Sequence, residues 1–313
     1  MKIRGVPNAV RGTAPATPLP ERREGAGCGA NPSQKTGPTD MAIRKAGRSG
    51  LFAIARGNAM GAGANDNAFD EPGRAAVYRA IFTRRDVRSD FTGEPIDDTV
   101  LARLIQAAHH APSVGFMQPW NFIVIRDLPR REQVRDLFLA ARTEEEAHIV
   151  EDRRALYRKL RLEGICESAL NLCITCDRSR AKDSPLGRWH NPEMDLFSTV
   201  CAVQNFWLAA RAEGIGVGWV SILDRTALKG WLGIPDHVVP VAYLCVGRVS
   251  SFASVPELQS RNWRRRLPLA DLVMAERYGA AGDPGLAKEI DRLADCPTPA
   301  AAPQARTRRA PCP

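Results

Sequence analysis

The sequence, 313 residues long, lacks the features that place a chain in or across a membrane. No run approaches the roughly 18–20 consecutive apolar residues that span a bilayer. No continuous apolar segment near the N-terminus resembles a secretory signal. The hydrophobic content of 44% is nevertheless enough for an ordinary globular core. We therefore expect a cytoplasmic protein without membrane association.

A dinucleotide fingerprint and a metal-ligand pattern are lacking as well. No GxGxxG motif follows a first strand, which disfavours a Rossmann site. The CxxC pair Cys173 and Cys176 lies in a strand-like run, where residues i and i+3 face opposite sides. No second CxxC or pair of histidines completes a zinc set. We predict no metal site, and we expect most of the eight cysteines to be buried, reduced thiols.

Basic residues are in excess, but the excess is concentrated outside the central part of the chain. Of the net charge of +9, residues 1–70 contribute +5 and residues 71–279 only +3. A central region with so small an excess is not a polyanion-binding surface. We therefore expect no nucleic-acid partner.

Composition divides the chain into three parts. Residues 1–70 are rich in Gly, Ala, Pro and Arg without sustained periodicity, which predicts a disordered basic extension. Residues 71–279 alternate between helical and strand patterns and predict the folded domain. Residues 280–313 return to Pro, Ala and Arg and predict a mostly disordered tail, with one or two helical turns at 288–293.

Hydrophobic periodicity predicts a series of helices and strands within the folded domain. Asp70 and Pro72 provide the chemistry of a helix start. Helices are predicted at 71–83, 98–109, over the charged stretch 128–160 (a candidate lid), at 195–212 and at 225–232, and strands at 121–125, 170–176, 218–222 and 239–246. The helix at 195–212 is apolar nearly all round, which is typical of a core or a subunit interface. This mixture predicts the α+β class.

Residues 84–88, with the sequence RRDVR, place three guanidinium groups around one carboxylate at the end of the first predicted helix. Arginine matches phosphate oxygens with paired donors, so this pattern indicates a phosphate site. The alternative is a solvated cluster of salt bridges that contributes little to stability. A second basic run at 261–268, RNWRRRLP, favours the phosphate site if both runs meet on one anion.

Two further segments place polar side chains at the ends of predicted strands. The loop at 112–120, PSVGFMQPW, carries Gln118 and Trp120 just before a strand, where loop residues commonly serve ligands. Another apolar strand ends in Ser221, whose hydroxyl is either a donor to a heterocycle or a cap of the next turn. We interpret this loop and residues 84–88 as two walls of a site for a phosphorylated, planar ligand.

The order of these motifs resembles the nitroreductase-type FMN-binding family. The shared pattern is RRxxR after a first helix, PSxxxxQPW before a strand, an apolar GxGxGW strand and a late RxRLP. Within the family, residues 75–278 most resemble the 5,6-dimethylbenzimidazole synthase group, through strings at 84–88, 109–122, 162–165 and 216–222. The resemblance implies a nitroreductase-like fold with a central mixed or antiparallel sheet surrounded by helices. It also implies an intertwined homodimer with the flavin between the subunits.

The resemblance assigns site residues. Flavin contacts are expected from Arg84, Arg85, Asp86, Val87, Arg88, Ser113, Gln118, Ser221, Arg264 and Arg266. The arginines would hold the phosphate and ribityl chain, while Asp86 and Ser221 would be catalytic. Asp86 stands where other members of the family usually carry Ser, and Phe116 where Asn is common. We expect the flanking arginines to keep Asp86 ionised so that it acts as a general base.

The implied reaction is the O2-dependent fragmentation of reduced FMN, consumed as a substrate, to 5,6-dimethylbenzimidazole, the lower ligand of vitamin B12. Reducing equivalents from NAD(P)H would arrive indirectly, through a separate flavin reductase. A second hypothesis is a general NAD(P)H-dependent nitro- or quinone reductase with a recycling FMN. A third is a non-catalytic flavin or nucleotide binder whose basic tail recruits partners. The acid at position 86 and the presence of Phe116 favour the first hypothesis.

Overall fold

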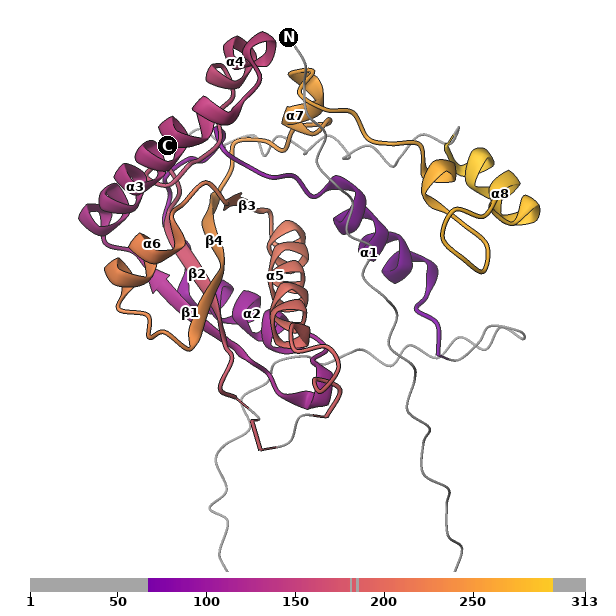
Figure 1. Ribbon diagram of the computed structural model, residues 1–313, viewed down its shortest axis with the longest axis horizontal. Coiled ribbons are helices and arrows are strands. Elements are labelled where there is room, and N and C mark those ends of the chain that lie inside the picture. The colour runs from indigo at the N-terminus through magenta and orange to yellow at the C-terminus, as the bar shows by residue number, and fades with distance from the viewer. Residues whose placement is uncertain (1–66, 181, 184–185, 295–313) are drawn as a thin grey trace, which may run out of the picture. The chain divides into compact units, whose positions relative to one another are not determined.

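The computed structural model of the chain describes residues 67–180, 182–183 and 186–294 (Figure 1). The predicted basic extension lies almost wholly outside these residues, as does the predicted tail from residue 295 onward. The described part combines helices with one antiparallel sheet, so the predicted α+β class is confirmed. None of its helices is long and apolar enough to cross a bilayer.

The elements follow one another along the chain in nearly the predicted order. They are α1 (Glu71–Thr83), α2 (Asp98–His109), η1 (Val114–Phe116), β1 (Trp120–Ile125), α3 (Leu128–His148), α4 (Glu151–Arg158), β2 (Leu170–Asp177), α5 (Met194–Ala212), β3 (Ile215–Val220), α6 (Arg225–Leu232), β4 (Val238–Arg248), α7 (Glu257–Ser260), η2 (Leu269–Leu272) and α8 (Pro284–Ala294). Helix α1 begins as predicted, because the Asp70 carboxylate accepts a hydrogen bond from Gly73 N at 2.9 Å.

Three predicted boundaries were wrong. The charged stretch 128–160 forms two helices, α3 and α4, because Ile149 and Val150 adopt extended backbone between them. The helix near the C-terminus, α8, is longer than the predicted one or two turns. Strand β3 begins at Ile215 and ends at Val220, not at 218–222, because its glycines lie inside the strand and do not lead into it.

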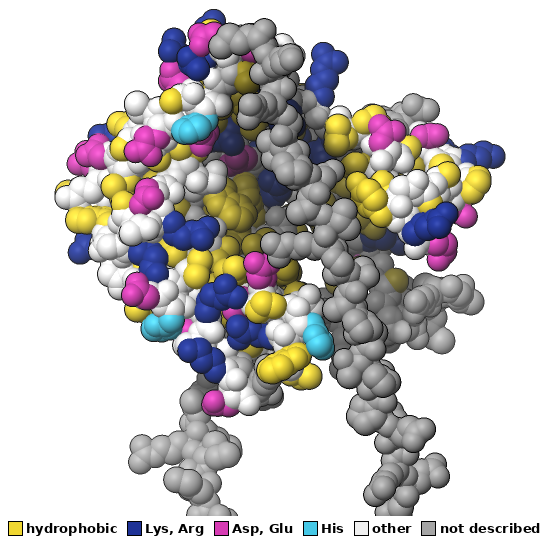
Figure 2. All heavy atoms as spheres, in the orientation of Figure 1, with side chains coloured by type: hydrophobic (Ala, Val, Ile, Leu, Met, Phe, Trp, Pro, Cys, Tyr) yellow, Lys and Arg dark blue, Asp and Glu magenta, His cyan; other side chains and the backbone are white. Residues whose placement is uncertain are grey.

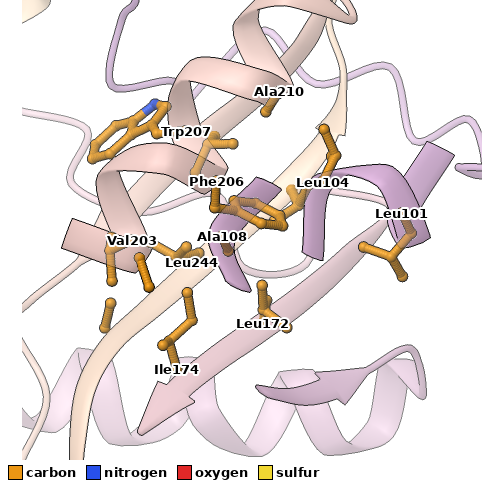
Figure 3. Close-up of a cluster of buried hydrophobic side chains, with 14 of the residues drawn as sticks. Leu101, Leu104, Ala108, Leu172, Ile174, Val203, Phe206, Trp207, Ala210 and Leu244 are labelled. Carbon is orange, nitrogen blue, oxygen red and sulfur yellow. The ribbon is translucent and has the colours of Figure 1, made fainter. Parts of the chain in front are cut away.

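The sheet has the strand order β1-β2-β4-β3, and all three pairings are antiparallel. Helices α2 and α5 cover one face and α3 and α6 cover the other (Figure 1). Both faces of the central strands are therefore buried, which explains their nearly continuous apolar sequences. Figure 3 shows the larger cluster, in which Leu104 of α2 and Phe206 of α5 lie beside Leu172 of β2 and Leu244 of β4.

The cysteines follow the alternation of the strands. Cys173 belongs to the cluster under α3 and α6, whereas Cys176 contacts Thr199 of α5 on the other face. The CxxC pair therefore faces opposite sides, as predicted, and both thiols are free and buried. Cys245 is also buried, but Cys201 is exposed on α5, so the expectation of burial was wrong for that residue. Its exposure indicates that the described residues leave one side of α5 uncovered.

The charge distribution agrees with the small excess calculated from the sequence. On the face shown in Figure 2, Asp and Glu side chains are interspersed among Lys and Arg side chains over the described residues. No group of three or more His, Cys, Asp or Glu side chains in the described residues is arranged to hold a metal ion.

Candidate active site

The arginine segment, residues 84–88, runs in extended conformation along the outer edge of β3. Asp86 forms a parallel bridge with Val217, and Val87 N donates to Val217 O at 3.0 Å. The approach is close, because a Cβ atom added to Gly218 would overlap the carbonyl oxygen of Val87. A Cβ added to Gly216 would overlap the side chain of Val249 and crowd that of Val87. These glycines therefore let the arginine segment pack directly on the sheet.

This packing fixes both oxygens of the Asp86 carboxylate. Oδ1 accepts a hydrogen bond from the backbone N–H of Trp219 at 2.9 Å, and Oδ2 pairs with the Arg88 guanidinium. About a third of the Asp86 side chain, 31%, stays exposed, whereas Arg88 is 11% exposed. The carboxylate is thus held from two sides and open on one, as a group that reacts with a ligand must be.

Burial raises the pKa of Asp86 above its ordinary value, and this effect exceeds the opposing influences of Arg88, the Trp219 N–H and Arg84. The expectation that the arginines set the protonation of Asp86 needs correction, since removal of water from the carboxyl is the larger effect. A carboxylate with a raised pKa is a stronger proton acceptor when ionised. The base predicted from the sequence is therefore better suited to that role than an exposed aspartate.

The two basic runs predicted from the sequence come together. Burial lowers the pKa of Arg84 and Arg85, and the positive charge of Arg266 lowers both further, although Asp86 opposes the change at Arg84. Arg266 is therefore close enough to the arginine segment to repel it. Arg264 and Arg266 are both exposed. The result is a concentration of positive charge around Asp86.

A cavity of about 420 Å³ lies against residues 85–90 and is closed on another side by Ser251, Glu257 and Arg261. Its volume falls within the range of about 300–1,000 Å³ that is typical of small-molecule sites. The Nε atoms of Arg85 and Arg88 are buried and have no hydrogen-bond partner in the described part of the chain. Arg85, Arg88 and Arg261 line the cavity, and guanidinium groups pair with phosphate oxygens, so the residues fit a phosphorylated ligand.

Ser221 lies directly after the end of β3, two residues beyond the Trp219 N–H that binds Asp86. The residue is exposed, and its carbonyl oxygen accepts a hydrogen bond from Leu223 N at 3.0 Å. Both residues predicted to be catalytic are therefore positioned by β3: Asp86 is hydrogen-bonded to its backbone, and Ser221 follows its last residue.

The polar loop, residues 113–118, is held in a strained conformation. Ser113 Oγ accepts a hydrogen bond from Gln118 N at 3.1 Å, and three residues have positive φ: Gly115 (61°), Phe116 (51°) and Gln118 (47°). Positive φ is costly for residues with a side chain and is found where function requires it. Phe116 is 82% exposed while Met117 is buried. The phenyl ring is therefore not packed against the described part of the chain, whereas Met117 is.

Within one chain, the polar loop and the arginine segment do not meet. Strands β1 and β3 are opposite edges of the sheet, three steps of about 4.8 Å apart. Trp120, which follows the polar loop, pairs with Cys176 of β2. Val217 pairs with Val246 of β4, and Val246 in turn pairs with Leu170, so Val217 is level with Leu170 of β2. Leu170 and Cys176 are six residues apart, which is about 20 Å along β2. The two predicted walls are therefore parts of one site only if they come from different chains.

Helix α5 holds both walls and supplies contacts that the sequence analysis missed. Near its start, Ser198 Oγ accepts a hydrogen bond from Val114 N at 3.2 Å. Near its end, the Trp207 ring lies 4.7 Å from the Arg84 guanidinium and its Nε1 donates to Arg85 O at 3.2 Å. Arg211 donates to Thr83 O at 3.2 Å. Trp207 and Arg211 are four residues apart on one helical face, which is the signal that would have identified them.

Comparison with known proteins gives the family. Residues 81–248, more than half of the chain, match the sequence profile of the nitroreductase family. The chain therefore belongs to the nitroreductase family. The 5,6-dimethylbenzimidazole synthase of Rhodospirillum rubrum is 40% identical over 200 residues, which cover 64% of this chain and 94% of that protein. The 5,6-dimethylbenzimidazole synthase of Rhodobacter capsulatus is 36% identical over 200 residues, which cover 64% of this chain and 96% of that protein.

A solved structure shows the same fold at lower sequence identity. Iodotyrosine deiodinase, crystallised with FMN and 3-iodo-L-tyrosine, matches with a TM-score of 0.50 and 18% identity, over 65% of this chain and 99% of that one. The predicted nitroreductase-like fold is thereby confirmed.

Proposed function

We propose that the chain is a 5,6-dimethylbenzimidazole synthase, which fragments FMNH2 with O2 and releases 5,6-dimethylbenzimidazole and a sugar phosphate derived from the ribityl chain. The observation that carries the proposal is Asp86, a carboxyl with a raised pKa held between the Trp219 N–H and Arg88 beside a cavity with unsatisfied arginine donors. Two proteins named 5,6-dimethylbenzimidazole synthase are 36–40% identical to this chain, and the matched regions cover 94% and 96% of those proteins.

FMN enters this reaction as the substrate. We assign Arg84, Arg85 and Arg88, with Arg264 and Arg266, to the phosphate and ribityl chain, because Arg266 repels Arg84 and Arg85, and Arg85 and Arg88 line the cavity. Val87 lines the same cavity and is assigned to the flavin contacts for that reason. The chemistry supplied by reduced flavin is its reactivity toward O2, and the chain's own contribution is orientation and proton transfer.

Asp86 and Ser221 are the residues that we propose to be catalytic. An ionised Asp86 accepts a proton from the bound flavin or its ribityl chain, and the exposed hydroxyl of Ser221 hydrogen-bonds the reacting edge. Trp219 N–H and Arg88 hold the carboxylate in place during the transfer. This arrangement requires no dinucleotide site in the chain, so a separate flavin reductase would supply FMNH2.

We further propose a homodimer in which the polar loop of one chain completes the site of the other. The polar loop and the arginine segment are too far apart within a chain to share a ligand, and Ser113 and Gln118 are assigned to the flavin of the partner. Apolar residues exposed on α1 and α5 provide a contact surface: Val77, Tyr78, Ile81, Phe82, Phe197 and Val200. Phe116, 82% exposed, would be covered in the same assembly.

The test is to mix the purified full-length chain with FMNH2 in air and to separate the products by chromatography. Formation of 5,6-dimethylbenzimidazole with stoichiometric loss of flavin supports the proposal, and Asp86→Asn provides the inactive control. Steady oxidation of NAD(P)H with a nitro or quinone acceptor, with FMN left intact, would identify a general reductase instead. Binding of FMN without either reaction would identify a flavin binder.

A further inference from the structure

The run that carries Arg264 and Arg266 is anchored to the chain through the residue that precedes it, Trp263. Trp263 N and Arg264 N both donate to Leu258 O, at 2.8 Å and 3.3 Å. The turn is tight, because Asn262 adopts a positive φ of 59°. Trp263 is half-buried, whereas the arginines that follow it are exposed.

Arg153 of α4 holds Trp263 by its ring and by its backbone. The Arg153 guanidinium lies 4.0 Å from the centre of the indole ring, and its Nη2 donates a hydrogen bond to the Trp263 carbonyl oxygen. A cation stacked on an aromatic face that also binds the neighbouring carbonyl restricts both rotation and translation of the residue. Arg153 has no comparable role in the sheet or in the arginine segment.

Tyr157, one turn further along α4, also contacts Trp263. Their ring centres are 6.2 Å apart, and Tyr157 is buried. The Tyr157 hydroxyl donates to Glu145 of α3 at 3.2 Å. Arg142 of α3 stacks on Tyr157 and donates to Leu160 O at 3.0 Å, at the end of α4. These contacts join α3 and α4, which follow one another in Figure 1, into one braced unit.

The basic cluster needs such an anchor. The charge of Arg266 repels Arg84 and Arg85 before any anion is present. Without an external contact, this repulsion would move the exposed run at 264–266 into solvent, where the Debye length of about 8–10 Å screens its charge. An anion would then have to draw the run back on binding, at a cost in affinity.

We propose that Arg153, Tyr157 and Trp263 form a clamp through which α3 and α4 position Arg264 and Arg266 for the flavin phosphate, and that this clamp makes the chain prefer FMN over riboflavin. The inference rests on the proposed function, because it assumes that the phosphate bound here is that of FMN. It gives the charged stretch 128–160 a role in binding specificity. Arg153 is a positioning residue, since it acts through Trp263.

The test compares the dissociation constants of oxidised FMN and riboflavin, measured by flavin fluorescence on the full-length chain. For Arg153→Ala we expect the value for FMN to rise about tenfold, as for one weakened charge-assisted contact. The value for riboflavin should change less than about twofold, because riboflavin has no phosphate for the clamped arginines to bind. Arg153→Lys, which keeps the cation over the ring, should restore part of the preference.

Arg158→Ala is the matched control. Arg158 lies on the same helix and pairs with Glu146 of α3 at 2.7 Å, in an exposed salt bridge away from Trp263. Its removal should leave both dissociation constants unchanged. Because the two ligands are compared on one sample, a partly unfolded variant loses affinity for both equally and does not imitate the expected result.

The outcomes separate the inference from the function on which it rests. If the unaltered chain binds FMN and riboflavin equally, the phosphate assignment of the proposed function fails. If the unaltered chain prefers FMN and Arg153→Ala keeps that preference, the clamp is wrong and the proposed function stands. A second variant, Trp263→Ala, must also lose the preference. Equal losses for both flavins in the two variants would contradict a role in phosphate positioning.

Discussion

Gly218→Ala tests whether the close packing of the arginine segment on β3 builds the site. The added methyl group would overlap the Val87 carbonyl oxygen, which belongs to the backbone and cannot rotate away. To relieve the overlap, the segment must move off the strand. The movement would break the hydrogen bond from Val87 N to Val217 O and the one from the Trp219 N–H to Asp86.

The size of the effect follows from these contacts. Loss of a neutral backbone hydrogen bond costs about 1 kcal/mol, and loss of one to a charged group about 1.5–3 kcal/mol. Overpacking at a tight site adds about 1–3 kcal/mol. We therefore expect the free energy of unfolding to fall by about 4 kcal/mol, out of a total of about 5–15 kcal/mol for a typical domain. The fold should survive, but the position of Asp86 should not.

The assay is urea unfolding followed by circular dichroism, combined with a flavin-binding titration on the folded variant. Gly230→Ala is the matched control, because a Cβ at this exposed position of α6 meets nothing within 4 Å. Alanine in a helix should raise the free energy of unfolding by about 0.5–1 kcal/mol. If Gly218→Ala unfolds within about 0.5 kcal/mol of the unaltered chain and still forms product, the reasoning about close packing is refuted.

Four further outcomes are expected. Burial raises the pKa of Asp86, so the folded chain binds that proton more tightly than the unfolded chain, and the free energy of unfolding falls as pH rises through the folded pKa. Asp86→Asn should therefore be more stable in urea than the unaltered chain at pH 8. The variant should still bind flavin but form no product. In the unaltered chain, kcat/KM should fall on the acid side with a pKa above 3.8, the ordinary value, and a limb at or below that value would contradict the burial argument. Ser221→Gly should lower product yield less than Asp86→Asn, and an unchanged yield by chromatography would remove Ser221 from the mechanism. Asp86→Asn chains mixed with Ser113→Ala/Gln118→Ala chains should regain activity at about a quarter of the sites after subunit exchange, and no recovery would contradict a shared site.

Local sequence signals predicted the elements wherever one pattern dominated. The ends of α2 and α6 agree with the predicted ranges 98–109 and 225–232, because apolar periodicity and polar caps lie at the same places. Asp224, for example, accepts a hydrogen bond from Ala227 N at 2.6 Å at the start of α6. The error at β3 arose because the prediction began the strand at Gly218 and left Gly216 outside it. These two glycines allow the arginine segment, which is distant in sequence, to pack closely on β3.

The candidate site was predicted as a set of residues but not as an arrangement. RRDVR and RNWRRRLP were recognisable because phosphate chemistry restricts the choice of side chain, and the structure brings Arg266 near Arg84 and Arg85. The balance of effects on Asp86 was not predictable, because burial depends on how the chain packs. Trp207 was missed because its ring reads as one more apolar residue in α5.

Sequence alone determined the class of the chain, the helices and strands, and the residue types that a phosphorylated flavin would require, since each of these depends on nearest neighbours along the chain. Only the tertiary structure decided that Asp86 is held by the backbone of β3, that burial outweighs the arginines at its carboxyl, and that the polar loop lies at the opposite edge of the sheet. These depend on strand order and on removal of water. Both are properties of contacts between residues far apart in the chain.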